Sequence, residues 1–133
     1  MKSKTIVVSI AVSAAAVYEF ASNPENLPRW VPSFCKSVTQ TNGDWVMQSP
    51  TGPVTFRFVE NNPFGVLDHS VRLPSGLEIH NPMRVIPNGE GSEVIFTLFQ
   101  TSNMNDEQYA QDAKLVVQDL RTLKRVLEEL HAH

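Results

Sequence analysis

The sequence predicts an α+β domain in which a curved antiparallel sheet of seven strands packs against a long C-terminal helix, with two short helices after the first strand. Two observations carry this prediction. Five turn signals at short intervals separate β-rich runs across the middle of the chain, and an apolar stripe at helical spacing runs along its last part. A chain of 133 residues has room for one such domain, which we expect to span residues 1–133.

The N-terminal part contains one strand and two short helices. Residues 5–12 (TIVVSIAV) are mostly β-branched and apolar, which favours a strand. The Ala-rich segment 13–21 permits a helix, with Ser13 as a candidate N-cap. A second helix is expected over residues 24–30, with Asn23 as its cap and Pro24 at its first position. Pro32 ends it.

Five turn signals divide the middle of the chain into six expected strands. The signals are NG at 42–43, PTGP at 50–53, NNPFG at 61–65, PSG at 74–76 and NGEG at 88–91. Because a slip of one residue turns every side chain to the other face, the register should place apolar residues opposite one another. The expected inward pairs are Leu73–Leu77, Val71–Ile79, His69–Asn81, Leu67–Met83, Phe58–Leu67, Phe56–His69, Val54–Val71, Met47–Val54, Trp45–Phe56, Met83–Val94, Asn81–Phe96 and Ile79–Leu98.

The same register brings opposite charges together on the outer face. Each exposed pair contributes at most about 1 kcal/mol, so the matching signs matter as support for the register. The expected outer pairs are Arg72–Glu78, Arg57–Asp68, Asp44–Arg57 and Arg84–Glu93.

A long helix closes the chain. Asn105 and Gln108 have capping-box spacing, and acidic residues occupy the first turn. One apolar stripe follows, made of Tyr109, Ala113, Val116, Leu120, Leu123, Leu127 and Leu130. A coiled-coil dimer could also use this stripe, but an open apolar sheet face in the same chain favours intramolecular packing.

The inward face of the expected sheet is apolar except for two residues. His69 and Asn81 lie on that face, opposite each other on neighbouring strands. A buried polar group without a partner costs about 1 to 3 kcal/mol, so these two must bond each other, water or a ligand. Three interpretations remain open: mutual bonding inside a filled core, orientation of a ligand, and acid/base catalysis by His69. No inward carboxylate is expected to assist the histidine, which weakens the third interpretation.

Composition argues against several classes of function. A net charge of −3 with interspersed signs predicts no basic face for nucleic acid. The N-terminus lacks a long unbroken apolar run, so we expect a cytoplasmic protein without membrane insertion, although basic MKSK followed by small residues leaves a signal peptide as the alternative. No metal or cofactor is expected, since His131 and His133 have no third ligand nearby, and Cys35 has no activating base. Ile86, Ile95 and Phe99 form an outer apolar patch that suggests a possible homodimer.

Four stretches of the sequence resemble a known family. They are VYEFASNPENLPRW, FGVLDH, MRVIPNGEGSEVIFTLF and DLRTLKRVLEEL, and together with the order of elements they look like the START-like superfamily, in its polyketide cyclase/dehydrase and lipid transport group. The resemblance covers nearly the whole chain. It implies a helix-grip fold with a cavity for an apolar molecule between sheet and long helix.

The sequence therefore predicts a protein that binds a small apolar or aromatic molecule, such as a lipid or a polyketide-like compound. The alternatives are a polyketide cyclase or dehydratase with His69 as acid/base, and a scaffold with a filled core. The expected ligand-binding residues are His69, Asn81, Trp30, Trp45, Phe56, Phe58, Val71, Met83, Phe96, Val116 and Leu120.

Overall fold

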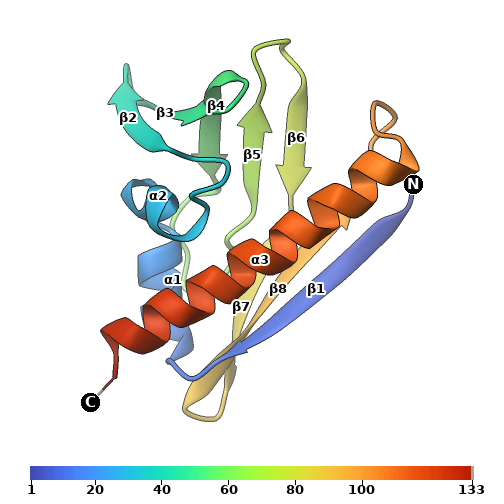
Figure 1. The fold of residues 1–133 in the computed structure, drawn as a ribbon. Helices are drawn as coiled ribbons and strands as arrows, with labels where there is room; N and C mark the ends of the chain where they lie inside the picture. The colour runs from blue at the N-terminus through green and yellow to red at the C-terminus, as the bar shows by residue number, and fades with distance from the viewer. Residues whose placement is uncertain (133) are drawn as a thin grey trace.

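A computed structural model describes residues 1–132 of the chain (Figure 1). The elements follow in the order β1 (Ser3–Ile10), α1 (Ala14–Ala21), the 3₁₀ helix η1 (Pro24–Asn26), α2 (Leu27–Trp30), β2 (Ser37–Thr41), β3 (Asp44–Ser49), β4 (Gly52–Phe58), β5 (His69–Arg72), β6 (Glu78–Asn81), β7 (Met83–Asn88), β8 (Gly91–Phe99) and α3 (Asp106–Leu130).

The strands form two antiparallel sheets, and α3 lies diagonally across them (Figure 1). One sheet has the order β1-β8-β7 and the other has the order β2-β3-β4-β5-β6. Helices α1 and α2 lie beside the C-terminal half of α3. The predicted α+β class, the short helices after the first strand and the long C-terminal helix are confirmed. The sheet differs from the prediction, because the described residues form eight strands in two sheets.

The extra strand arises at Pro82. A single strand was expected from residue 77 to the turn at 88–91, but β6 ends at Asn81 and β7 begins at Met83. Proline has no N–H to give to a ladder, so it interrupts regular pairing. Its carbonyl accepts a hydrogen bond from the Thr97 N–H at 3.0 Å. Because this carbonyl already faces β8, the missing N–H also lies on the β8 side, and the regular β7–β8 ladder begins only at Met83. On the other side the chain stays beside the segment that precedes β5, through the Val66–Arg84 bridge and the bond from the Leu67 N–H to the Met83 carbonyl.

Two of the four predicted hairpin registers are confirmed. Trp45–Phe56 and Met47–Val54 pair between β3 and β4. Between β5 and β6 the observed pairs are His69–Asn81, Val71–Ile79 and Arg72–Glu78, as expected.

The other two registers are wrong by two residues. Phe58 pairs with His69 and Phe56 with Val71, whereas Leu67 and His69 were the expected partners; the pair Val54–Val71 is wrong for the same reason. Met83 pairs with Phe96 and not with Val94, and Asn81–Phe96 and Ile79–Leu98 do not pair because β6 and β8 belong to different sheets. A shift of two residues keeps every side chain on its face.

Local contacts explain both shifts. Before β5, the Asn62 side chain accepts hydrogen bonds from the N–H groups of Phe64 and Val66, each at 3.0 Å, and donates one to the Val66 carbonyl. These bonds hold residues 62–66 in a loop and away from β4. In the hairpin between β7 and β8 the ladder continues to the pair Asn88–Gly91. The two turn residues are therefore Gly89 and Glu90, one position later than a turn at Asn88 and Gly89, and this moves the register by two residues.

Asp68 bridges the loop before β5 and the start of β7. Its carboxylate accepts two hydrogen bonds from the Arg84 guanidinium, at 3.0 and 2.9 Å, and one from the Met83 N–H at 2.9 Å. The expected pairs Arg57–Asp68 and Arg84–Glu93 are therefore wrong, while Arg57–Asp44 and Arg72–Glu78 are present. The hydrogen bond from Arg84 holds the pKa of Asp68 below its usual range.

The predicted helix caps are confirmed. Ser13 accepts a hydrogen bond from the Ala16 N–H, Asn23 accepts one from the Glu25 N–H, and Asn105 with Gln108 forms a capping box at the start of α3. The second short helix begins as 3₁₀ and continues as α2.

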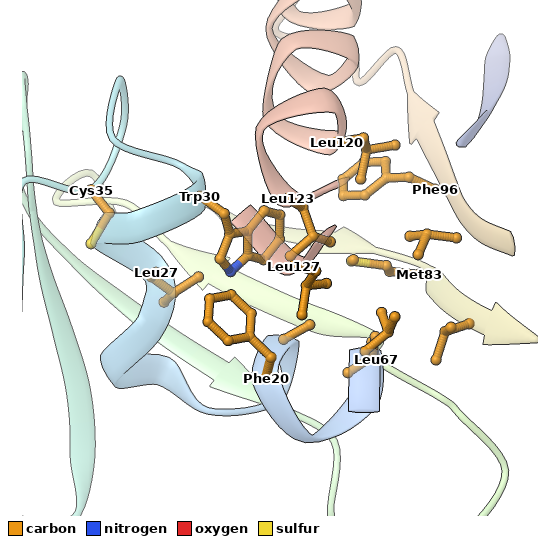
Figure 2. Close-up of a cluster of buried hydrophobic side chains, with 14 of the residues drawn as sticks. Phe20, Leu27, Trp30, Cys35, Leu67, Met83, Phe96, Leu120, Leu123 and Leu127 are labelled. Carbon is orange, nitrogen blue, oxygen red and sulfur yellow. The ribbon is translucent and has the colours of Figure 1, made fainter. Parts of the chain in front are cut away.

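The filled part of the core lies under the C-terminal half of α3. Leu123 and Leu127 are fully buried there and meet side chains from α1, α2 and β7 (Figure 2). The cluster includes Phe20, Leu27, Trp30, Leu67 and Met83.

Two further observations concern the surface. Among residues 1–132 no helix combines the length and the apolar character needed to cross a bilayer. In the expected outer patch Ile86 is exposed, whereas Ile95 and Phe99 are only half-buried; the homodimer stays a prediction. His133 lies outside the described residues.

Gly65 provides a test of the close contact between the loop and β7. Its φ is +73°, and a Cβ at this position would clash with the Val85 carbonyl. Gly65→Ala should lower the free energy of unfolding by at least about 2 kcal/mol more than Gly76→Ala. Gly76 is the matched control, because its φ is +90° but nothing lies within 4 Å of the added methyl. Equal urea midpoints for the two variants would contradict this account.

Candidate functional site

A cavity of about 580 Å³ lies between the sheet and the N-terminal part of α3. Its sheet wall comes from β3, β4, β5, β6 and β8. Its helix wall runs from Gln108 to Leu120, and α2 with the following loop contributes one end. Most of the wall is apolar. The polar lining residues are Ser33, Thr51, His69, Asn81, Asn103, Gln108, Asp112 and Asp119.

Eight of the eleven predicted site residues line this cavity. They are Trp30, Phe56, His69, Val71, Asn81, Phe96, Val116 and Leu120. Whether they contact a ligand stays a prediction.

The other three predicted residues lie elsewhere. Met83 is fully buried in the filled part of the core (Figure 2). Phe58 packs edge-on against the rings of Phe56 and His69, with centroid distances of 4.7 and 5.6 Å. Trp45 is half-buried on β3 and lies outside the cavity wall. Predicting which side chains point inward from a strand was therefore not enough to predict which of them line the cavity.

His69 is a buried, neutral histidine. Its ring stacks on Phe56 at a centroid distance of 4.9 Å, and Nδ1 lies 3.0 Å from the Leu67 carbonyl oxygen. Since a carbonyl only accepts, Nδ1 carries the proton and Nε2 is left as an acceptor. Burial lowers the pKa of His69 from 6.5 to about 4. Among residues 1–132 no group donates a hydrogen bond to Nε2.

The His69–Asn81 hydrogen bond, one of the three interpretations of this pair, is not formed. The two residues are register partners, but the imidazole bonds the Leu67 carbonyl on its own strand. The described residues show no hydrogen bond between the two side chains, and the half-buried Asn81 lines the cavity separately. These two side chains therefore do not satisfy each other's hydrogen-bonding groups.

Two carboxyl groups face the cavity from α3, so the expectation of no inward carboxylate is wrong. Asp112 and Asp119 both belong to the cavity wall. Burial raises the pKa of Asp119 from 3.8 to about 7, and it also raises the pKa of Asp112. Neither carboxylate has an ion-pair partner among residues 1–132.

The sequence did contain a signal for Asp119. Its helix neighbours three and four positions away are Leu115, Val116, Thr122 and Leu123, none of them basic. Solvent-facing acids further along the helix do have such partners, in the ion pairs Lys124–Glu128 and Arg125–Glu129. An acid surrounded by apolar neighbours at these spacings indicates burial.

Trp30 adds a buried donor at the end of the cavity. Its indole N–H has no acceptor among the described residues. Figure 2 draws the nitrogen on the ring edge that faces Phe20, so the N–H points toward an aromatic ring.

Cys35 is buried near α2, and burial raises the pKa of its thiol to about 11, which keeps it protonated and unreactive.

A second hollow of about 740 Å³ lies between α3 and β1 and shares no lining residue with the cavity. Its wall contains Lys4, Lys114, Arg121 and Arg125. The interspersed charges of the sequence did not indicate that these four would share one surface.

Comparison with known proteins identifies the family. The family described as polyketide cyclase / dehydrase and lipid transport matches residues 1–128. The chain belongs to this family. Curated protein sequences contain no match to this chain.

Several solved structures share the fold of this chain. XoxI from Bacillus cereus has a TM-score of 0.78 at 20% identity, with all of both chains covered. A START superfamily protein from Mycobacterium smegmatis has a TM-score of 0.70 at 14% identity, covering 96% of this chain and 98% of the other. DynU16, a putative protein in the dynemicin biosynthetic locus, has a TM-score of 0.74 at 16% identity, covering 96% of this chain and 48% of the other.

The buried carboxyl of Asp119 should make stability depend on pH. Between pH 4 and 7 the folded protein retains a proton on the Asp119 carboxyl that the unfolded chain has released. The folding stability therefore falls as pH rises through that window. Asp119→Asn should therefore be more stable than the native protein at pH 8, by about 1 to 2 kcal/mol. The difference should shrink toward zero at pH 4, as measured by urea unfolding.

His69 provides a contrast of opposite sign. As pH falls from 6.5 to 4, His69 becomes protonated in the unfolded chain but stays neutral in the folded protein, where it is buried. The native protein therefore loses stability on acidification. His69→Gln should remove that loss and leave the effect of Asp119. Stability differences that stay constant from pH 4 to 8 for both variants would contradict the assigned burial.

Proposed function

We propose that this protein binds a small apolar or aromatic molecule in the cavity between the sheet and α3. The observation that carries the proposal is the cavity itself, about 580 Å³ with mainly apolar walls and a few polar groups. This volume falls within the roughly 300 to 1,000 Å³ typical of small-molecule sites. Membership of a family described by polyketide cyclases and lipid transport supports the proposal.

The arrangement of the wall suits an aromatic or branched apolar guest. Phe56 and Phe96 offer ring surfaces from the sheet, and Val116 and Leu120 face them from the helix. A filled-core scaffold is less consistent with this space, because a water molecule occupies only about 30 Å³ of liquid volume and an apolar cavity of this size gains by binding a guest. The polar groups are few, which is the usual pattern where apolar contact provides affinity and polar groups provide orientation.

A fluorescent probe can test binding. N-phenyl-1-naphthylamine is uncharged at neutral pH, and its emission rises in an apolar site. We expect saturable binding by the native protein and at least a tenfold loss in Val116→Trp, since the larger ring occupies cavity volume. Val117→Trp is the matched control, because this neighbouring valine lines the other hollow. An equal affinity in both variants, or no saturable signal from the native protein, would refute the proposal.

Acid/base catalysis in the same cavity is a second candidate, and one observation favours it. A general acid or base works best when its pKa lies near the operating pH. Burial places the pKa of Asp119 at about 7 and that of His69 at about 4. In a cyclase or dehydratase of this family Asp119 would thus exchange the proton, and neutral His69 would orient the substrate by accepting a hydrogen bond at Nε2.

Variant kinetics separate the two roles for any substrate that the protein converts. Asp119→Asn should lower kcat by about a hundredfold or more, the usual contribution of a positioned acid or base. His69→Gln should act mainly on KM. Full turnover by Asp119→Asn would exclude this residue as the acid/base group.

A further inference from the structure

We propose that the cavity selects an apolar molecule carrying a basic nitrogen, which pairs with Asp119, and that it rejects fatty acids and other apolar anions. This inference rests on the proposed binding function and specifies its ligand class. Three features of the cavity support it: the charge of the wall, the free acceptor on His69 and the position of the two acids on α3.

The charge of the wall has one sign. The titratable residues that line the cavity, within residues 1–132, are His69, Asp112 and Asp119, and the lining contains no lysine or arginine. His69 is neutral because burial keeps its pKa low. A carboxylate or phosphate ligand would therefore lie in a mainly apolar space beside two acids and no cation, which electrostatics disfavours.

The imidazole of His69 presents an acceptor and not a donor. The residue is 8% exposed, and its only proton is engaged by the Leu67 carbonyl. Nε2 is thus an acceptor open to the cavity, with no donor among the described residues, so it can accept a hydrogen bond from a ligand. An ammonium or amine N–H can donate to Nε2, whereas an ionised carboxylate cannot.

The two acids share the face of α3 that covers the cavity. Gln108, Asp112, Leu115 and Asp119 follow at spacings of four, three and four residues, so they form one stripe along the helix, and all four line the cavity. The apolar neighbours of Asp119 offer no compensating cation. A cation brought by the ligand would supply the missing charge and would favour the ionised form of Asp119.

The alternative is that the acids are simply protonated and that the ligand is neutral. This alternative predicts no preference for an amine over an alcohol of the same shape. It also predicts that replacing Asp119 by its amide leaves affinity unchanged, because a protonated carboxyl and an amide differ little in size and both can donate and accept.

Three naphthalene derivatives of nearly equal shape test the inference. They are 2-naphthylmethylamine, 2-naphthylmethanol and 2-naphthoate, titrated at pH 8 by calorimetry or by their own fluorescence. At this pH the amine is mainly protonated and the naphthoate is ionised. We expect the amine to bind at least tenfold more tightly than the naphthoate and several-fold more tightly than the alcohol.

Two variants assign the preference to the cavity. Asp119→Asn should weaken binding of the amine by about tenfold, leave the alcohol nearly unchanged and improve binding of the naphthoate. Asp106→Asn is the matched control on the same helix. The side chain of Asp106 is 84% exposed and lies outside the cavity wall, so this variant should bind all three probes like the native protein.

The outcomes separate this inference from the function on which it rests. Equal binding of amine and alcohol, tighter binding of the naphthoate, or an unchanged amine affinity in Asp119→Asn would overturn it, even where the neutral probe N-phenyl-1-naphthylamine binds and responds to Val116→Trp. Failure of the neutral probe would instead refute binding in the cavity altogether.

Discussion

The bend at Pro82 is the constraint on which the rest of the structure depends. At this residue the β6 ladder with β5 gives way to the β7 ladder with β8, and the Asp68 carboxylate binds both the Met83 N–H and the Arg84 side chain just beyond it. On the neighbouring segment Gly65 lies against the Val85 carbonyl. These contacts hold the two sheets at a fixed junction (Figure 1). A straight helix of 25 residues that crosses two sheets joined in this way cannot contact both along its whole length.

As a result, the two halves of α3 have different surroundings. Its C-terminal half meets α1, α2 and β7, and there Leu123, Leu127 and Met83 fill the interior (Figure 2). Its N-terminal half covers the cavity toward β5, β6 and β8, and the Tyr109 hydroxyl donates a hydrogen bond to the Leu98 carbonyl of β8 at 2.9 Å. The packed core and the proposed binding site therefore occupy different parts of one hydrophobic interior. Substitutions in the filled part should act through packing density, and substitutions at the cavity through the space and the polar groups offered to a guest.

Burial gives the cavity two titratable groups with opposite behaviour. Removal from water disfavours whichever form is charged, so it lowers the pKa of His69 and raises that of Asp119. Near neutral pH the sheet wall then offers a neutral acceptor, while the helix wall holds a carboxyl close to its midpoint of titration. The ionisation of Asp119 is thus sensitive to the charge of its surroundings, and the proposed charge recognition and the proposed proton exchange both depend on this one group.

The sequence by itself determined the elements, their caps and the faces of the strands, because these depend on neighbours along the chain: Ser13, Asn23 and Asn105 cap as expected, and the alternation that turned His69 and Asn81 inward was right. Family membership also followed from the order of elements. Only the tertiary structure decided the break at Pro82, the two-residue shifts and the partner of Asp68, since each depends on contacts between segments whose lengths the hydrophobic pattern does not set. It also decided that Met83 fills the core while Asp119 faces the cavity, because burial on a helix depends on what lies opposite it and not on the side chain alone.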